Sequence, residues 1–184
     1  MRPVKREELL DYQTWSDQRA SEMSRILEIK RRRRVHLGKE LTFLFENRDT
    51  VRYQVQEMMR VERMVRESDI QHELLTYNEL LGGPGELGCS LLIEIDDVGR
   101  RAVLLREWKD LPAHLYVKLE GGRKVYATFD ERQIGDDRLS SVQFLKFKTG
   151  GECPVAIGSD LGVHVLEAPL TEDQRAVLAE DLRE

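Results

Sequence analysis

The sequence is short of cysteine, of aromatic residues and of long apolar runs, and each shortage excludes a class of protein. Two cysteines, Cys89 and Cys153, stand far apart, which leaves no disulfide framework and no Cys-x-x-Cys metal motif. No apolar run approaches the roughly 20 residues that a membrane-spanning helix needs. Residues 1–13 lack the apolar core of a signal peptide. We therefore expect a cytoplasmic protein that does not enter a membrane.

Recognisable catalytic motifs are missing as well. The sequence contains no Gly-x-Ser-x-Gly nucleophile elbow, and the glycines at 82–85 surround a proline and follow a predicted helix, unlike a phosphate-binding loop. The one Asp-x-x-His pair, Asp69 and His72, has no second copy of the kind that di-iron bundles use. We predict no cofactor and no metal site from the sequence. Whether the protein is an enzyme, and whether the fold assembles a metal site, stays open.

The composition fits a globular protein with an uneven distribution of charge. The 184 residues are 40% hydrophobic and 34% charged, enough for one domain with its own core. Residues 1–66 carry 16 Lys and Arg against 11 Asp and Glu, a net +5, whereas residues 67–184 carry 13 against 23, a net −10. The basic part could face an anionic partner. We favour the alternative, in which the two parts complement each other within one fold or between subunits.

The first part of the chain has helical periodicity interrupted by one strand. A long helix is predicted over residues 6–33, and period-two alternation predicts a strand over 35–46. Two shorter helices follow over 50–66, capped by Asn47 or Asp49, and over 68–81, opened by a Ser-x-x-Gln capping box. The long helix carries its stripe at three- and four-residue steps, on Tyr12, Ser16, Arg19, Met23, Ile26 and Lys30.

The second part reads mainly as strands. They are predicted over 87–95, 101–106, 114–120, 123–130, 141–148 and 162–167, with a hairpin at Gly121 and Gly122. A second capping box at residues 171–174 opens a short C-terminal helix. The predicted fold is therefore α+β, with N-terminal helices packed on a mainly antiparallel sheet. We predict one domain over 1–184, with a helical part over 1–82, a β part over 86–168 and a final helix over 171–183.

Three charged residues occupy positions where apolar residues belong. Arg19 and Lys30 fall near the middle of the apolar stripe of the first helix, and Glu62 falls on the apolar face formed by Val51, Val55, Met58 and Val65. Buried charges must be paired or neutralised. One interpretation is a polar pocket between the helices that holds an anion. The favoured one is an internal bridge, in which Glu62 is buried against Arg19 or Lys30, or side chains that extend to the rim.

Further polar residues lie near these three in the sequence and complete the candidate pocket. They are Glu46, Gln56, Glu57, Glu73 and Tyr77.

A run of arginines at the end of the first helix is a candidate phosphate site. It consists of Arg31, Arg32, Arg33 and Arg34. Basic clusters bind phosphate, but sequence-specific or single-strand binding also needs a groove-reading element or stacking aromatics. Aromatic residues make up only 7% of the chain. Because basic residues also complement the dipole of a helix C-terminus, we favour a structural role and do not expect nucleic acid as the partner.

Several segments together resemble a bacterial family catalogued as domain of unknown function 3501. They are Lys30, residues 33–35, Gly38, 43–47, 54–58, Arg60, Glu62, Glu73, 77–78, 110–114 and 140–145. The resemblance covers nearly the whole chain but implies no catalytic residue. Genes of this family are often found beside those of rubrerythrin-like and iron–sulfur oxidoreductase proteins. The resemblance therefore implies an accessory role in redox or oxidative-stress metabolism.

Three functional hypotheses follow in order of preference. The first is a cytoplasmic accessory protein that binds a partner protein or itself. The second is a small-anion- or metal-binding enzyme or sensor that uses the charged pocket between the helices. The third is a nucleic-acid binder that uses the arginine run.

Overall fold

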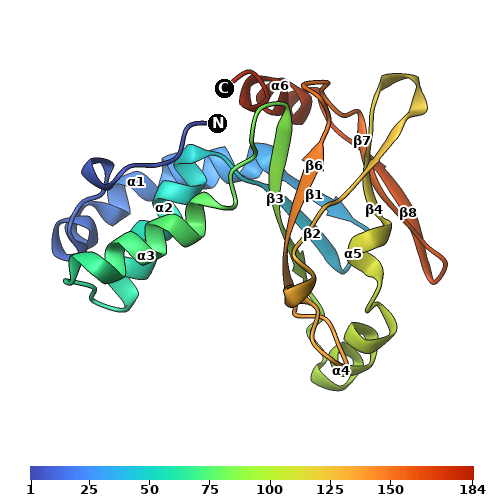
Figure 1. Cartoon of the computed structure of the whole chain (residues 1–184), viewed down its shortest axis with the longest axis horizontal. Coiled ribbons are helices and arrows are strands. Elements are labelled where there is room, and N and C mark those ends of the chain that lie inside the picture. Colours follow the sequence, from blue (N-terminus) through green and yellow to red (C-terminus); the bar gives the residue numbers. More distant parts are fainter.

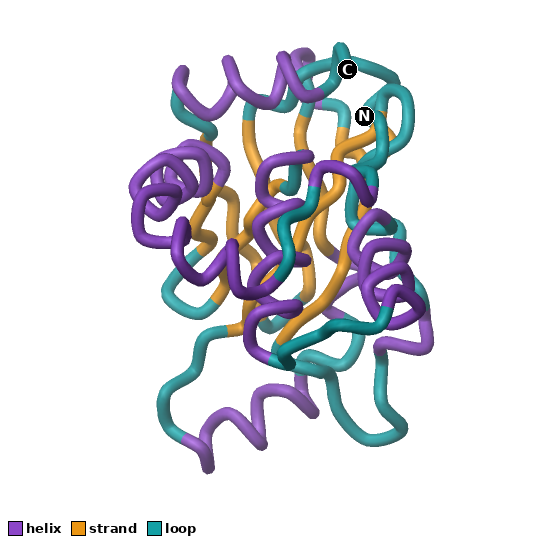
Figure 2. The backbone as a smooth tube through the Cα atoms, turned by 90° about the vertical axis from the view of Figure 1, so that its left-hand side faces the viewer, coloured by secondary structure: helices purple, strands orange, loops and turns teal.

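The protein consists of an arm of three helices and a body of two β-sheets. The computed structural model describes all residues, 1–184. The arm contains α1 (Tyr12–Arg33), α2 (Arg48–Val61) and α3 (Glu67–Asn78). It projects to one side of the strands, and α6 (Glu172–Asp181) and α4 (Val98–Glu107) lie at opposite ends of the body (Figure 1). Seen from the side of the arm, helices stand in front of the strands (Figure 2).

The body is a sandwich of two four-stranded antiparallel sheets. Sheet A has the order β1-β2-β3-β6 and sheet B the order β5-β4-β7-β8. A core of 22 buried residues fills the body, including Phe43, Phe45 and Phe147 from sheet A and Val117 and Ile157 from sheet B. The strands are β1 (Arg34–Leu37), β2 (Leu41–Phe45), β3 (Glu86–Ile93), β4 (Leu115–Lys118), β5 (Lys124–Tyr126), β6 (Val142–Lys148), β7 (Ala156–Leu161) and β8 (His164–Pro169). Short helical turns lie at Arg6–Glu8, Leu111–His114, Glu120–Gly122 and Glu131–Gln133.

The arm has an apolar core of its own. Val51, Val55 and Met59 of α2 pack with Ile70 and Leu74 of α3, and the N-terminal segment closes this cluster. A smaller cluster of Trp15, Ile26 and Tyr53 joins α1 to α2. The outer face of β2, with Leu44, is buried, whereas Phe144 on the same face of β6 is left partly exposed. Because each part has its own core, the expectation of a single domain stays a prediction.

The predicted α+β class is confirmed, and two of the three predicted helix caps are confirmed with it. The Asn47 side chain accepts from the backbone N–H of Thr50 at the start of α2, and Thr171 caps α6 in the predicted capping box. The predicted capping box at Ser68 is wrong, because α3 begins at Glu67 without a side-chain cap. The predicted long helix begins only at Tyr12, where Asp11 accepts from two backbone N–H groups.

The single strand predicted over 35–46 is wrong, since the segment is a hairpin of β1 and β2. Gly38 lies in the turn with a φ of +68°, a conformation that glycine adopts without strain. The register pairs Val35 with Phe43 and Leu37 with Leu41. Residues directly opposite each other in an antiparallel pair share a face. The apolar alternation therefore continues in phase through the turn, as it would in one long strand.

The strand predicted over 101–106 is also wrong, because these residues form α4. The Asp97 carboxylate accepts from the backbone N–H of Arg100 and caps this helix, and Leu105 and Trp108 anchor it to the body core. Strand β7 was not predicted, since its polar Ser159 and Asp160 break the apolar pattern.

No helix of the chain combines the length and the apolar character needed to cross a membrane.

A buried ion pair fixes the C-terminal helix to the end of α1. Arg33 donates from Nε and Nη2 to the two carboxylate oxygens of Asp181, at 2.9 and 2.8 Å. Both side chains are buried. Arg31 and Arg32 reach the exposed carboxylate of Asp173 on the same helix, at 3.5 and 3.6 Å. This part of the basic run therefore pairs with acidic residues from the far end of the same chain.

We predict that Arg33→Ala lowers the free energy of unfolding by about 3–5 kcal/mol, because Asp181 is left as a buried charge without a partner. Urea unfolding measures this loss. In contrast, Arg31→Ala removes only exposed pairs and should cost less than about 1 kcal/mol.

The double variant Arg33→Met, Asp181→Leu tests the same pair from the other side. It removes both charges and keeps apolar volume, so it should regain most of the stability lost in Arg33→Ala. Equal losses in Arg33→Ala and Arg31→Ala would contradict the structural role of the buried pair.

Candidate functional site

The junction between arm and body is built around a buried carboxyl group. Glu46 follows β2 directly and is 7% exposed. Its two oxygens lie 2.5 Å from Thr50 Oγ1, in the first turn of α2, and 2.6 Å from Ser90 Oγ on β3. Burial raises the pKa of Glu46 above its usual 4.5, and the two hydroxyl groups and Lys30 offset only part of that rise. Glu46 thus connects a strand, a helix and a neighbouring strand.

Lys30 of α1 lies beside this junction without a carboxylate partner. Its Nζ is 4.8 Å from the ring centroid of Tyr53, and it forms no ion pair within 4.0 Å. Burial lowers the pKa of Lys30, while the field of Glu46 acts in the opposite direction. The structure therefore brings Lys30 and Glu46 of the predicted pocket to one place. Neither residue lines the hollow at Phe144, the hollow at Arg63 or the hollow at Asp136.

A second charged cluster joins α1 to α2 around Glu57. Its carboxylate accepts from Arg19 Nε at 2.9 Å, from Trp15 Nε1 at 2.8 Å and from Arg60 Nε at 3.3 Å. The Glu57 side chain is 14% exposed. This is the internal bridge that the sequence favoured, with Glu57 as the acid instead of Glu62.

The predicted burial of Glu62 against Arg19 or Lys30 is wrong. Glu62 is exposed and forms no ion pair. The sequence placed Val65 on the same helical face, but α2 ends at Val61, Arg63 adopts a φ of +50°, and Val65 is 75% exposed. A helical phase carried past the end of the helix assigned Glu62 to the wrong side.

The remaining predicted residues fall into three separate places. Gln56 holds the N-terminal segment, since it accepts from Leu10 N at 2.6 Å and donates to Leu10 O at 3.1 Å. Glu73 and Tyr77 line a cleft below the arm. Arg34 is exposed, whereas the other three arginines of the run have carboxylate partners within the chain. Nucleic-acid binding through the run stays the least favoured of the three hypotheses.

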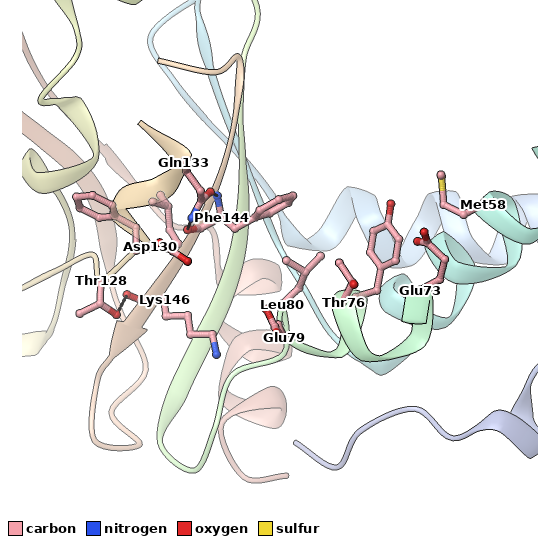
Figure 3. A pocket seen from close by; sticks show the side chains of 13 residues that line it. Met58, Glu73, Thr76, Glu79, Leu80, Thr128, Asp130, Gln133, Phe144 and Lys146 are labelled. Atoms are coloured by element: carbon pink, nitrogen blue, oxygen red, sulfur yellow. Dashed lines mark hydrogen bonds between the residues drawn. The ribbon is translucent and has the colours of Figure 1, made fainter. Parts of the chain in front are cut away.

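A wide cleft lies between the arm and the outer face of β6. It has a volume of about 790 Å³. Phe144 of β6 extends from the strand side, and Leu80, Thr76 and Glu73 lie opposite (Figure 3). We call it the arm–body cleft. Its lining residues are Met58, Glu73, Thr76, Tyr77, Glu79 and Leu80 from the arm, and Thr128, Phe129, Asp130, Gln133, Phe144, Leu145 and Lys146 from the body.

The cleft has an apolar floor and an acidic rim. Asp130 is paired with Arg132, and Lys146 lies 3.8 Å from Glu86, so these charges are largely compensated. Glu73 and Glu79 have no Lys, Arg or His nitrogen within 4.0 Å. The uncompensated charge of the cleft is therefore negative. This arrangement suits a ligand that carries an apolar group and positive charge.

A smaller hollow of about 450 Å³ adjoins the cleft and shares Phe129 with it. Three further carboxylates without an ion pair, Asp110, Glu131 and Asp136, line this hollow. Its Lys109 donates to the backbone oxygen of Asp136 at 2.6 Å. The acidic character of the arm–body cleft thus continues along the same side of the body.

Several cleft residues were missed by the sequence reasoning, above all Phe144, Phe129, Gln133 and Glu79. One signal was present for Phe144. The strand Val142–Lys148 carries apolar residues on both faces, with Leu145 and Phe147 on one and Val142 and Phe144 on the other. A strand with one face in the core needs only one apolar face. The second face indicates a surface available for contact.

No group of three or more His, Cys, Asp or Glu side chains is arranged as a metal site.

Comparison with known proteins assigns the chain to a family without an assigned activity. The model of a family described as a protein of unknown function, DUF3501, matches residues 3–182. The chain belongs to this family. A crystal structure of a novel protein of unknown function from Burkholderia pseudomallei K96243 is 30% identical to it. The match covers 98% of this chain and 100% of the other, with a TM-score of 0.91. No curated protein matches the chain.

We predict that Glu46→Gln weakens the pH dependence of stability. Because the pKa of folded Glu46 lies above its usual 4.5, folding takes up a proton there. The stability that this group contributes is complete at acid pH and declines as pH rises from about 4.5 through the raised value. The glutamine variant lacks this decline. Urea unfolding between pH 4.5 and about 8 measures it, and a variant much less stable than the wild type at neutral pH would contradict the prediction.

Glu57→Gln should change the pH dependence of stability in the opposite direction. Burial raises the pKa of Glu57, but the bonds from Trp15, Arg60 and Arg19 prevail and lower it below 4.5. Glu57 therefore contributes stability above pH 4.5 that is lost as pH falls through the lowered value. We expect a loss of about 1–3 kcal/mol at neutral pH that shrinks in acid. The exposed Glu62→Gln is the matched control, expected within about 0.5 kcal/mol of the wild type.

Proposed function

We propose that the protein is an accessory interaction protein that binds a segment of a partner protein in the arm–body cleft. The observation that carries this proposal is the combination of an exposed apolar floor with carboxylates that have no partner in the chain. The segment that fits carries an apolar side chain flanked by Lys or Arg. The acidic lining disfavours the small anion of the second hypothesis as the ligand of this cleft.

Exposed apolar surface for the partner lies on β6. Phe144 is 41% exposed and Val142 is 40% exposed, both on the outer face of sheet A. A partner side chain placed on them would remove apolar surface from water, worth about 25 cal/mol per Å² buried. Aromatic residues in a partly enclosed site are also the usual anchors of protein interfaces.

Carboxylates without an ion pair supply the negative charge around the cleft. Glu73 and Glu79 stand on the arm, and Asp110, Glu131 and Asp136 stand on the body next to the cleft. Charges of one sign on the rim of a cleft speed the encounter with an oppositely charged partner and select against like-charged ones. A basic segment is therefore preferred over an acidic one of the same shape.

The cellular setting of this proposal comes from the family resemblance. The resemblance implies a cytoplasmic bacterial protein whose partner belongs to redox or oxidative-stress metabolism. Self-association, also expected from the sequence, is a second outcome of the same type of interaction. It would appear as a concentration-dependent mass in analytical ultracentrifugation.

We predict that the labelled peptide Ser-Thr-Lys-Thr-Phe-Thr-Lys-Thr-Ser binds more tightly than the same peptide with Glu in place of Lys. Fluorescence anisotropy measures both. The double variant Glu73→Gln, Glu79→Gln should weaken binding of the basic peptide about 3- to 10-fold, because two rim charges are lost. Phe144→Ser should weaken it about 10-fold or more, because an aromatic anchor is lost.

Two exposed carboxylates away from the cleft serve as controls. Asp17 on α1 and Glu107 on α4 also lack an ion pair, so Asp17→Asn and Glu107→Gln change the net charge without changing the cleft. They should leave the affinity within about 2-fold. Equal binding of the two peptides, or the same loss in the control variants, would overturn the proposal.

A further inference from the structure

β6 is an edge strand whose free side is covered by side chains over part of its length. It pairs with β3 on one side only. Alternate residues of β6 direct their backbone groups to the free side. Lys146 exchanges two backbone hydrogen bonds with Thr128, each at 2.8 Å. Toward Val142, no further backbone partner follows on this side.

A glutamine side chain takes the place of a strand at Phe144. The Phe144 N–H donates to Gln133 Oε1 at 2.6 Å, and Gln133 Nε2 donates to Phe144 O at 3.2 Å. The next edge position, Val142 N, is served by the hydroxyl group of Ser140 at 3.3 Å. A primary amide offers one donor and one acceptor in the same arrangement as a peptide group. Gln133 therefore reproduces the contact that a neighbouring strand would make.

The segment that carries Gln133 is held mainly by exposed contacts, apart from Ile134, which packs partly buried against the body core. Residues 130–138 include no buried residue, and the hydrogen bonds between Gln133 and Phe144 are themselves exposed. Water can replace such bonds at little net cost. Few buried contacts and exposed hydrogen bonds are the features of a segment that opens locally. Gln133 also lines the arm–body cleft (Figure 3), so its movement would open the edge directly into the site.

We propose that an extended segment of the partner adds to sheet A as a strand next to β6, at Val142–Phe144, in place of the Gln133 amide. This inference rests on the proposed function and specifies how the partner binds. Backbone bonds to β6 supply affinity, and side chains on the cleft face supply selectivity. Residues opposite Phe144 point to the same face as its ring, toward the apolar floor and the acidic rim.

The pairing is antiparallel, as it is between all paired strands of this fold. In an antiparallel pair, the partner residues that share the face of Phe144 also direct their N–H groups to β6. In the basic peptide above, these are the Lys and Phe residues. Methylation of these three backbone nitrogens should abolish the pairing, whereas methylation of the first three Thr nitrogens places the methyl groups on the side away from β6.

The test compares these two methylated isomers with the unmethylated basic peptide on the full-length protein. We expect at least about a 10-fold loss for the Lys/Phe isomer and less than about a 3-fold change for the Thr isomer. The opposite asymmetry would support strand addition in a parallel direction. Equal affinities of all three peptides would overturn strand addition and leave the cleft as the binding site. No binding by any of them would overturn the proposed function itself.

Gln133→Ala tests the role of the glutamine. Loss of the competing amide should raise the affinity for the unmethylated peptide about 3- to 10-fold and leave the Lys/Phe isomer unaffected. The Phe144 amide should exchange its hydrogen faster in the free variant, and peptide should protect it. Gln71→Ala removes an exposed glutamine of the arm and is the matched control. Unchanged affinity and unchanged Phe144 exchange in Gln133→Ala would overturn the inference.

Discussion

The architecture depends on the burial of Glu46 where β2 ends and α2 begins. A carboxyl group in the interior needs hydrogen-bond donors, and they come from Thr50 on α2 and Ser90 on β3. These bonds fix the direction in which the helix leaves the sheet. Lys30 and Tyr53 pack beside them and bring α1 to the same point. Glu46 thus ties the arm to sheet A at their junction.

The cleft lies where the arm, with an apolar core of its own, does not pack on β6. That core, with Val55, Met59 and Leu74, joins α2 to α3. The outer face of β6 is therefore left with Phe144 partly exposed, and its edge is completed by Gln133 instead of a strand. Exposed aromatic surface and unused strand edges are liabilities in an isolated protein. Their coincidence in one acidic cleft is the reason that we assign the interaction to this place.

The opposite charges of the two parts of the chain are used in two ways. Arg33 and its neighbours pair with Asp173 and Asp181, which supports the internal complementarity favoured from the sequence. Residues 67–184, the acidic part, contain more carboxylates than the two in these pairs. Some of the excess, including Glu73 and Glu79, lies around the arm–body cleft and forms no ion pair within 4.0 Å. The charges that indicate a partner are therefore those that form no ion pair within the chain.

The sequence by itself determined what depends on neighbouring residues. Caps at Asn47 and Thr171, the alternating burial of β6, and the α+β class follow from contacts within a few positions. The tertiary structure decided what depends on where an element ends and what it meets. The early end of α2 made Glu57, not Glu62, the partner of Arg19, and residues distant in sequence, such as Glu79 and Phe144, met in one cleft. Periodicity carries the phase of a helix but not its end, and it carries no information on contacts between elements.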